Sequence, residues 1–201
     1  MFWLRNVRHV YKELFENKQS PILMNKTAPS FFADLNTILH NYLLLEFAKI
    51  TDPAETYDKE NFTVGNLIVS IDWPQDIQGK LTSLSDKTKG FRSHIKPARH
   101  KLLAHTDKEA FLAERTLGEF PEGEDEVFLK ALQEVCDITH QACFGLVFGQ
   151  MIMAKPGDVV NFKRVLENAI AFNELLSESS GQEKTRLYSY LEKARCQTRL
   201  E

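Results

Sequence analysis

The sequence predicts an all-α helical bundle, and three observations lead to this prediction. Apolar residues recur at steps of three and four over most of the chain, which is the period of an amphipathic helix. Pro and Gly residues separate these segments at intervals typical of helix ends. The one stretch with strand-like composition has no evident partner strand. We therefore expect six to eight helices in a single domain that spans residues 1–201.

The first half of the chain contains four predicted helices. The second of them has the clearest apolar period, and Asp52-Pro53 ends it. The third combines β-branched residues with a helical apolar spacing, and we predict a helix because no strand could pair with it. The four helices are predicted at residues 3–17, 31–50, 61–71 and 74–91, the last ending at Gly90.

A long helix is predicted from Glu124 to Met153. Its apolar residues follow an unbroken alternation of fours and threes, and its second half is apolar on all sides. A helix of that kind must be buried on most sides. We therefore expect it at the centre of the bundle or across a dimer interface, where Gly145 and Gly149 would let a neighbouring backbone approach closely.

Two more helices are predicted toward the C-terminus, at residues 158–176 and 182–199. They follow the breaks Pro156-Gly157 and Ser179-Ser180-Gly181. We expect the bundle core over about residues 30–178, with the helix at about residues 182–199 as a C-terminal addition.

Composition and charge narrow the classes of function. The formal net charge of -3 gives no global attraction to nucleic acid or to an anionic membrane, so such a partner must meet a local patch. The first residues have no apolar stretch typical of a signal peptide, and the most apolar window is shorter than the roughly 20 residues that span a bilayer. Cys136 and Cys143 lie about 10 Å apart along one helix, too far for a disulfide. We expect a cytoplasmic protein with reduced thiols and no membrane partner.

Positive charge gathers in one segment, residues 87–108. Asp107 is its only acid. A solvated basic helix face would account for this composition, and so would a functional site, because a permanent cation and a titratable imidazole suit metal-free cleavage of a phosphodiester. The segment contains Lys87, Lys89, Arg92, Lys96, Arg99, Lys101 and Lys108, together with His94, His100 and His105.

The end of this segment predicts a corner between two helices. Thr106 and Glu109 match a capping box, so one helix is expected to stop near His105 and another to start at Thr106. Pro97 lies two residues before Arg99, where it is expected to start or kink the helix. On a regular helix Arg99 and His105 would point about 120° apart, so one copy need not form a tight pocket. Two copies across a twofold axis could form one, which predicts a composite site at a dimer interface.

Other chemistries receive less support from the sequence. His94, His100, His105 and Asp107 could be considered as metal ligands, but their spacing matches no established ligand pattern. Cys136 and Cys143 are predicted within a buried apolar helix, where cysteine behaves as a small hydrophobic residue. The chain has no glycine-rich phosphate loop. We expect neither a metal nor another cofactor.

At the Arg99 run the sequence resembles the HEPN superfamily, whose signature is an arginine, commonly a polar residue, and a histidine four to six residues after the arginine. Arg99, His100 and His105 match these places. The closer resemblance is to the AbiU-type branch, associated with abortive infection, through Arg99-His100-Lys101 and Ala104-His105-Thr106-Asp107-Lys108. The upstream stretches 47–53 and 61–67 are also similar to that branch, so the resemblance covers roughly residues 30–115.

The resemblance implies a HEPN-like bundle with a four-helix core and additional helices, assembled as a homodimer with two motifs facing each other. It also implies a metal-independent endoribonuclease that serves as a toxin or phage-defence effector, for which a cognate antitoxin is a further expected partner. Arg99 would bind the scissile phosphate, His105 would act as general base or acid, and His100 would orient the phosphate or support His105. RNA would also contact Lys96, Lys101, Arg92, His94 and Lys108.

Two other classes of function remain open. One is a non-catalytic HEPN-like module that binds a nucleotide, RNA or a protein, since members of the superfamily with this role are known and fold does not fix function. The other is a structural dimerisation bundle, which predicts no salt-sensitive interaction with RNA.

Overall fold

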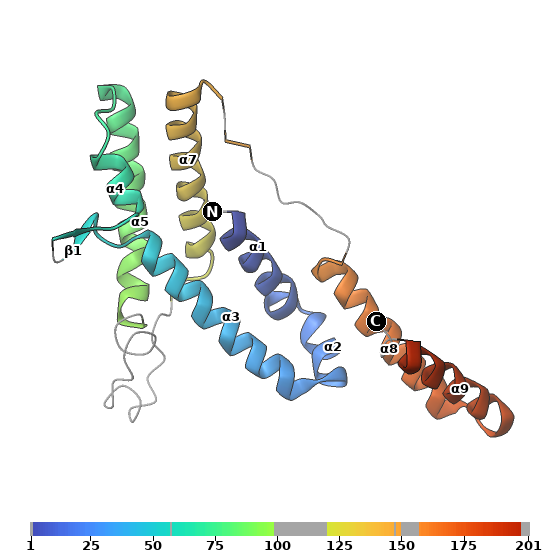
Figure 1. Ribbon diagram of the computed structural model, residues 1–201. Helices are drawn as coiled ribbons and strands as arrows, with labels where there is room; N and C mark the ends of the chain where they lie inside the picture. The colour runs from blue at the N-terminus through green and yellow to red at the C-terminus, as the bar shows by residue number, and fades with distance from the viewer. Residues whose placement is uncertain (1, 57, 99–119, 147, 150–156, 198–201) are drawn as a thin grey trace. The chain divides into compact units, whose positions relative to one another are not determined.

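The computed structural model describes residues 2–56, 58–98, 120–146, 148–149 and 157–197 (Figure 1). Nearly all of its regular structure is helical, which confirms the predicted all-α class. The elements are α1 (Phe2–Tyr11), the π-helix η1 (Lys12–Glu16), α2 (Ser20–Thr27), α3 (Pro29–Ile50), β1 (Glu55–Thr56), β2 (Lys59–Glu60), α4 (Val64–Val69), α5 (Gln75–Ala98), α7 (Glu124–Phe144), α8 (Val159–Glu178) and α9 (Gly181–Gln197).

The chain forms two compact units. The first unit comprises residues 1–11 and 35–153, and the second comprises residues 12–34 and 154–201. Helix α3 therefore begins in the second unit and contributes most of its length to the first.

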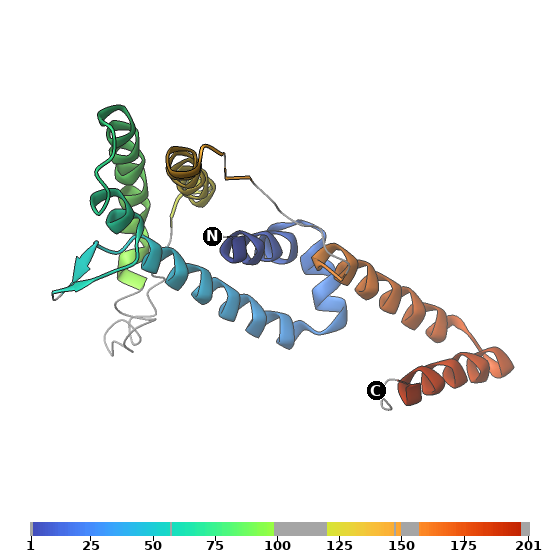
Figure 2. The same ribbon diagram turned by 45° about the horizontal axis from the view of Figure 1, so that its top comes forward.

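Four helices of the first unit, α1, α3, α5 and α7, meet around one apolar core. Helices α5 and α7 run antiparallel and side by side, as Figures 1 and 2 show. Three aromatic rings fill the space between them and α3: Phe91 stacks on Phe128 with ring centroids 4.5 Å apart, and Phe47 meets both edge-on. The core residues are Leu4, Val7, Leu43, Leu44, Phe47, Ala48, Phe91, Ile95, Phe128 and Leu132.

A second apolar cluster joins α4 to the other half of the α5–α7 pair. Helix α4 starts at a capped end, where the Thr63 hydroxyl accepts a hydrogen bond from the Asn66 backbone N–H at 3.2 Å. Beyond its last turn the Trp73 indole donates to the Leu67 carbonyl at 3.3 Å. The cluster contains Ile68, Trp73, Leu81, Leu84, Ala131 and Val135. Immediately before α4, strands β1 and β2 form a short antiparallel hairpin.

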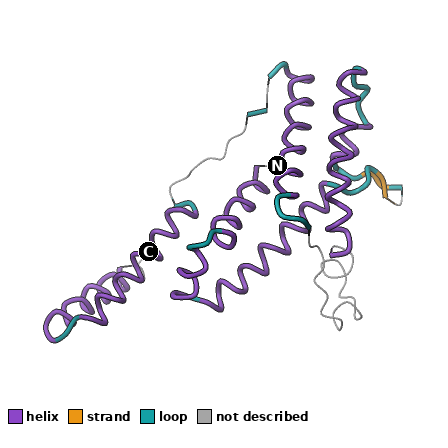
Figure 3. The backbone as a smooth tube through the Cα atoms, turned by 180° about the vertical axis from the view of Figure 1, so that it is seen from behind, coloured by secondary structure: helices purple, strands orange, loops and turns teal. Residues whose placement is uncertain are grey.

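In the second unit α2 packs against η1 and α8 (Figure 3). The Ser20 hydroxyl donates to the Glu13 carbonyl at 2.7 Å, and the Glu13 carboxylate pairs with Lys163 of α8 at 2.6 Å. Asp158 caps α8 by accepting from the backbone N–H groups of Val160 and Asn161. This cap starts the helix where the sequence predicts it.

Two of the predicted helix ends are wrong, those of α5 and α7, and the first is the end of α5. Helix α5 continues past Gly90 to Ala98 because its buried face, Leu81, Leu84, Thr88, Phe91 and Ile95, keeps an unbroken period of threes and fours through the glycine. Pro97 lies in the last described turn of α5 instead of starting a helix.

Helix α7 ends at Phe144 and does not reach Met153. Gly145 takes a left-handed conformation, with φ of 70°, and this terminates the helix. The chain then turns back along α7, since the Gln133 side chain donates to the Phe148 carbonyl at 3.0 Å. Phe144 and Leu146 are 70% and 65% exposed, so these two residues do not lie at the centre of the bundle, and the alternative of a dimer interface remains a prediction.

The other five predicted helices agree with the structure in kind. The first is α1 continued by η1, the second is α3, the helix predicted at residues 61–71 is the shorter α4, and the two C-terminal helices are α8 and α9. Helix α2 and the β1–β2 hairpin were not predicted. None of the helices within the described ranges combines the length and apolar character needed to cross a bilayer.

Candidate functional site

The last turns of α5 carry the described part of the basic segment. Phe91 and Ile95 on these turns are 1% and 0% exposed, and both belong to the four-helix core. Because these two side chains are buried in close-packed surroundings, the described end of the helix that leads to Arg99 is fixed in position by core packing.

Arg92 links the C-terminal ends of two helices of the first unit. Its guanidinium lies 3.7 Å from the carboxylate of Asp52, which follows α3, and the two side chains are 24% and 12% exposed. The end of α3 is itself fixed, since the Thr51 hydroxyl donates to the Phe47 carbonyl at 2.9 Å. Arg92 therefore has an observed structural partner, Asp52, in addition to its predicted role in RNA binding.

The other described cations of the segment reach solvent. Lys96 and Lys87 are exposed, His94 is half-buried, and Lys89 pairs with Asp86 at 3.0 Å on the same helix face. Lys89 and Lys96 are seven residues apart and share one face of α5. A cation near the C-terminal end of a helix is favoured by the helix dipole. The end of α5 thus presents positive charge on a chain that is acidic overall.

The centre of the predicted motif lies outside the described residues. This holds for Arg99, His100, Lys101, His105 and Lys108, and for the predicted capping box at Thr106 and Glu109. Their assignments remain predictions, and so does the helix corner at His105.

The histidines of α3 and α7, His40 and His140, have local partners. Partial burial beside the Tyr11 ring, 6.1 Å away, lowers the pKa of His40. The His140 ring nitrogen Nδ1 lies 2.7 Å from the Leu146 carbonyl oxygen. The His140 ring also lies beside the Phe144 and Phe148 rings, with centroids 4.9 and 5.4 Å apart.

The two cysteines of α7 differ in environment. Cys136 is half-buried, and burial raises the pKa of its thiol. Cys143 is exposed, so the prediction that both lie in a buried apolar helix is wrong for Cys143. Within the ranges that the structure describes, no three His, Cys, Asp or Glu side chains converge as metal ligands would.

Asp52 is the residue of this region that sequence reasoning missed. The sequence marks it only as a helix end, because its partner Arg92 lies on a different helix. The missed length of α5 did leave a signal: the apolar period from Leu81 to Ile95 continues through Gly90. Following that period would have placed Arg92, His94 and Lys96 on one continuous helix.

The AbiU2 family model of HEPN proteins matches residues 1–151. The chain belongs to this family. The match covers three quarters of the sequence and includes the whole run from Arg99 to His105. It extends the predicted resemblance, residues 30–115, in both directions. The comparison with curated proteins finds no match, and neither does the comparison with solved structures.

Proposed function

We propose that this AbiU2-family chain is a metal-independent endoribonuclease, with a toxin or phage-defence role, whose site is composed of two copies of the Arg99–His105 run in a homodimer. The observation that carries the proposal is the family match over residues 1–151, which contains the arginine, the polar residue and the histidine of the HEPN signature at the spacing of that signature.

The proposed reaction is attack of a ribose 2′-hydroxyl on the adjacent phosphodiester. His105 would take the proton of the hydroxyl or donate one to the leaving 5′-oxygen, because an imidazole exchanges protons near neutral pH. Arg99 would bind the phosphate and stabilise the charge that develops on it. The products would be a 2′,3′-cyclic phosphate and a free 5′-hydroxyl. His100 would orient the phosphate or support His105.

The described end of α5 supports this proposal in two ways. Burial of Phe91 and Ile95 and the Arg92–Asp52 ion pair hold the helix that precedes Arg99, and preorganised positioning is what such catalysis requires. The exposed Lys87 and Lys96 supply local positive charge, which attracts a polyanion to an otherwise acidic chain.

The test is incubation of the purified chain with end-labelled RNA in EDTA, followed by analysis of the 3′ ends. We expect cleavage with cyclic-phosphate ends, reduced by about 10²- to 10⁴-fold in His105→Ala and Arg99→Ala. Arg164→Ala is the matched control, because Arg164 is an exposed arginine of α8 that donates a hydrogen bond to Asn161 on its own helix.

Two outcomes would contradict the proposal. One is absence of cleavage of any cellular RNA pool at concentrations that give dimers. The other is salt-sensitive RNA binding without turnover, only modestly weakened in His105→Ala, which would make the chain a non-catalytic binding module.

A further inference from the structure

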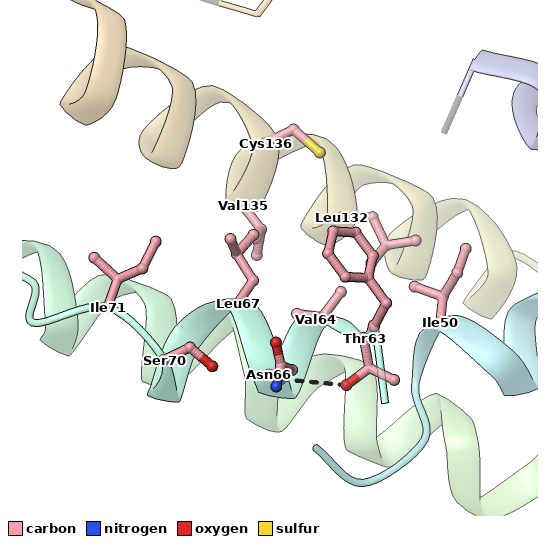
Figure 4. A pocket seen from close by; sticks show the side chains of 11 residues that line it. Ile50, Thr63, Val64, Asn66, Leu67, Ser70, Ile71, Leu132, Val135 and Cys136 are labelled. Carbon is pink, nitrogen blue, oxygen red and sulfur yellow. Dashed lines mark hydrogen bonds between the residues drawn. The ribbon is translucent and has the colours of Figure 1, made fainter. Parts of the chain in front are cut away.

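An apolar cavity lies in the first unit on the side of α4, away from the basic end of α5. It has a volume of about 470 Å³, opens to solvent, and is lined by α4 with its flanking residues, by Ile50 at the end of α3, and by one face of α7. Figure 4 shows Val64 and Leu67 of α4 directed toward Leu132 and Val135 of α7. A volume of this size falls within the range of small-molecule sites.

Among the described residues that line this cavity, none has a charged side chain. Its polar groups are few, namely Thr63, Asn66, Ser70 and the thiol of Cys136. The Thr63 hydroxyl is already engaged as the cap of α4. A carboxylate or phosphate placed here would lose its hydration without meeting a cation, which costs several kcal/mol by general transfer energies. The cavity therefore selects against nucleotides, RNA and anionic lipid headgroups.

The elements that form the walls of the cavity are fixed by core packing and hydrogen bonds. Ile68 of α4 and Trp73 after it are buried in the second core cluster, against which the lining residues Val64 and Leu67 also pack, and the Trp73 indole donates to the Leu67 carbonyl. The segment before α4 is fixed by the Asn61 amide, which donates to the Pro53 carbonyl and to the Thr56 hydroxyl, each at 2.8 Å. A cavity with anchored walls remains open instead of collapsing, as a preformed ligand site does.

Two apolar side chains that line the cavity are exposed to solvent and could contact a bound molecule. Phe62 is fully exposed and Ile71 is 40% exposed, although both line the cavity. An apolar molecule seated here would shield both from water, at a gain of roughly 25 cal/mol for each Å² covered.

We propose that this cavity is a binding site for an uncharged, apolar small molecule of drug-like size. The described lining shares no residue with the proposed ribonuclease motif, and its chemistry is opposite to that of an RNA-binding surface. The ligand makes its contacts with aliphatic and aromatic side chains and needs at most one or two weak hydrogen bonds, to Ser70 or Asn66.

The first test is a fluorescence titration of the full chain with Nile red, a neutral apolar dye. Ile71→Asp places a charge at the cavity and is expected to weaken binding by about tenfold or more. Val69→Asp is the matched control, because Val69 is 70% exposed near the same end of α4 but does not line the cavity. Its dissociation constant should change by less than about twofold.

The second test uses the two cysteines of α7 in one chain. N-ethylmaleimide labelling, followed by peptide mass spectrometry, should be slowed by saturating Nile red at Cys136, which lines the cavity, and unchanged at Cys143, which does not. This readout is independent of the variants and does not depend on how well they fold.

Three outcomes of these two tests would overturn the proposal. They are absence of saturable dye binding by the folded chain, equal losses in Ile71→Asp and Val69→Asp, and equal protection of Cys136 and Cys143. A change of oligomeric mass in Ile71→Asp, with dye binding unaffected, would assign the cavity to contact with a second protein chain and would also overturn it. Anionic 1-anilinonaphthalene-8-sulfonate binding as tightly as Nile red would refute the predicted selection for neutral ligands.

Discussion

Helices α5 and α7 pack against each other along their length, and the packing changes from one half to the other. In the half that leads to Arg99, the Phe91 and Phe128 rings stack and Phe47 of α3 closes the space beside them. In the half beside α4, the facing residues are the smaller Leu81, Ala131 and Val135, and a cavity of about 470 Å³ lies next to them.

This difference shows how one helix pair supports two kinds of surface. The aromatic half has no space to adjust, so it fixes the base of the basic segment that carries the proposed catalytic residues. The half beside α4 has anchored walls but an unfilled interior, which suits binding of an apolar molecule. The predictions below test whether the two halves differ in this way.

The largest effect is expected for Phe128→Ala in the aromatic half. Removal of a ring that is 1% exposed should lower the free energy of unfolding by about 3–5 kcal/mol. Phe144→Ala, on the same helix but 70% exposed, should change it by less than about 0.5 kcal/mol. Urea denaturation followed by circular dichroism measures both, and comparable losses would show that the aromatic core is described wrongly.

A direct comparison of the two halves uses the same substitution in each. Leu44→Ala, in the filled core, should cost about 2–4 kcal/mol, because it creates a new void. Leu67 is only half-buried and borders a cavity that already exists. Leu67→Ala should therefore lower the free energy of unfolding by less than half as much. Equal costs in urea denaturation would mean that the space beside α4 is filled in solution.

A smaller effect is expected at the start of α4. Thr63→Ala removes the cap that accepts from the Asn66 N–H and should cost about 1 kcal/mol. Thr63→Ser keeps the hydroxyl and should recover most of this loss. If Thr63→Ala also weakens Nile red binding, while Thr63→Ser does not, the cap helps to hold the cavity wall. Thermal unfolding of the two variants is the measurement, and equal melting temperatures would refute a capping role.

The smallest effect is a pH dependence from His40. Burial lowers its pKa in the folded state, so the unfolded chain binds more protons at this site as the pH falls below about 6.5. The free energy of unfolding should therefore decrease on acidification, and the contribution should be absent above about pH 7.5. Because His40 keeps much of its surface exposed, the effect is small. Unfolding of the wild-type chain and His40→Gln at pH 7.5 and 5.5 isolates it, and a larger acid loss in His40→Gln would reverse the sign.

Much of the fold follows from local periodicity. Helices α3, α8 and α9 were predicted closely because their apolar spacing and their end signals agree, as with Asp158 at the start of α8. The end of α7 was missed because apolar residues continue past Gly145, while the glycine's left-handed backbone ends the helix. The apolar period depends only on the side chains, so it does not show that the backbone at Gly145 leaves the helical conformation.

Contacts between distant residues account for the rest. The Arg92–Asp52 ion pair and the cavity walls depend on how α3, α4, α5 and α7 are placed together, which no local pattern contains. The motif residues Arg99 and His105, in contrast, were proposed from their types and spacing alone, and their roles stay predictions. Their placement lies outside the described residues.

The most direct measurement for the central proposal is complementation between two inactive variants. Arg99→Ala and His105→Ala chains are co-expressed with different tags, the mixed dimer is purified through both tags, and RNA cleavage in EDTA is measured. A site that combines Arg99 of one protomer with His105 of the other predicts recovery of activity in the mixed dimer, well above either variant alone and at most about half of the wild-type rate. A mixed dimer as inactive as its parents, beside an active wild-type dimer, would contradict a composite site.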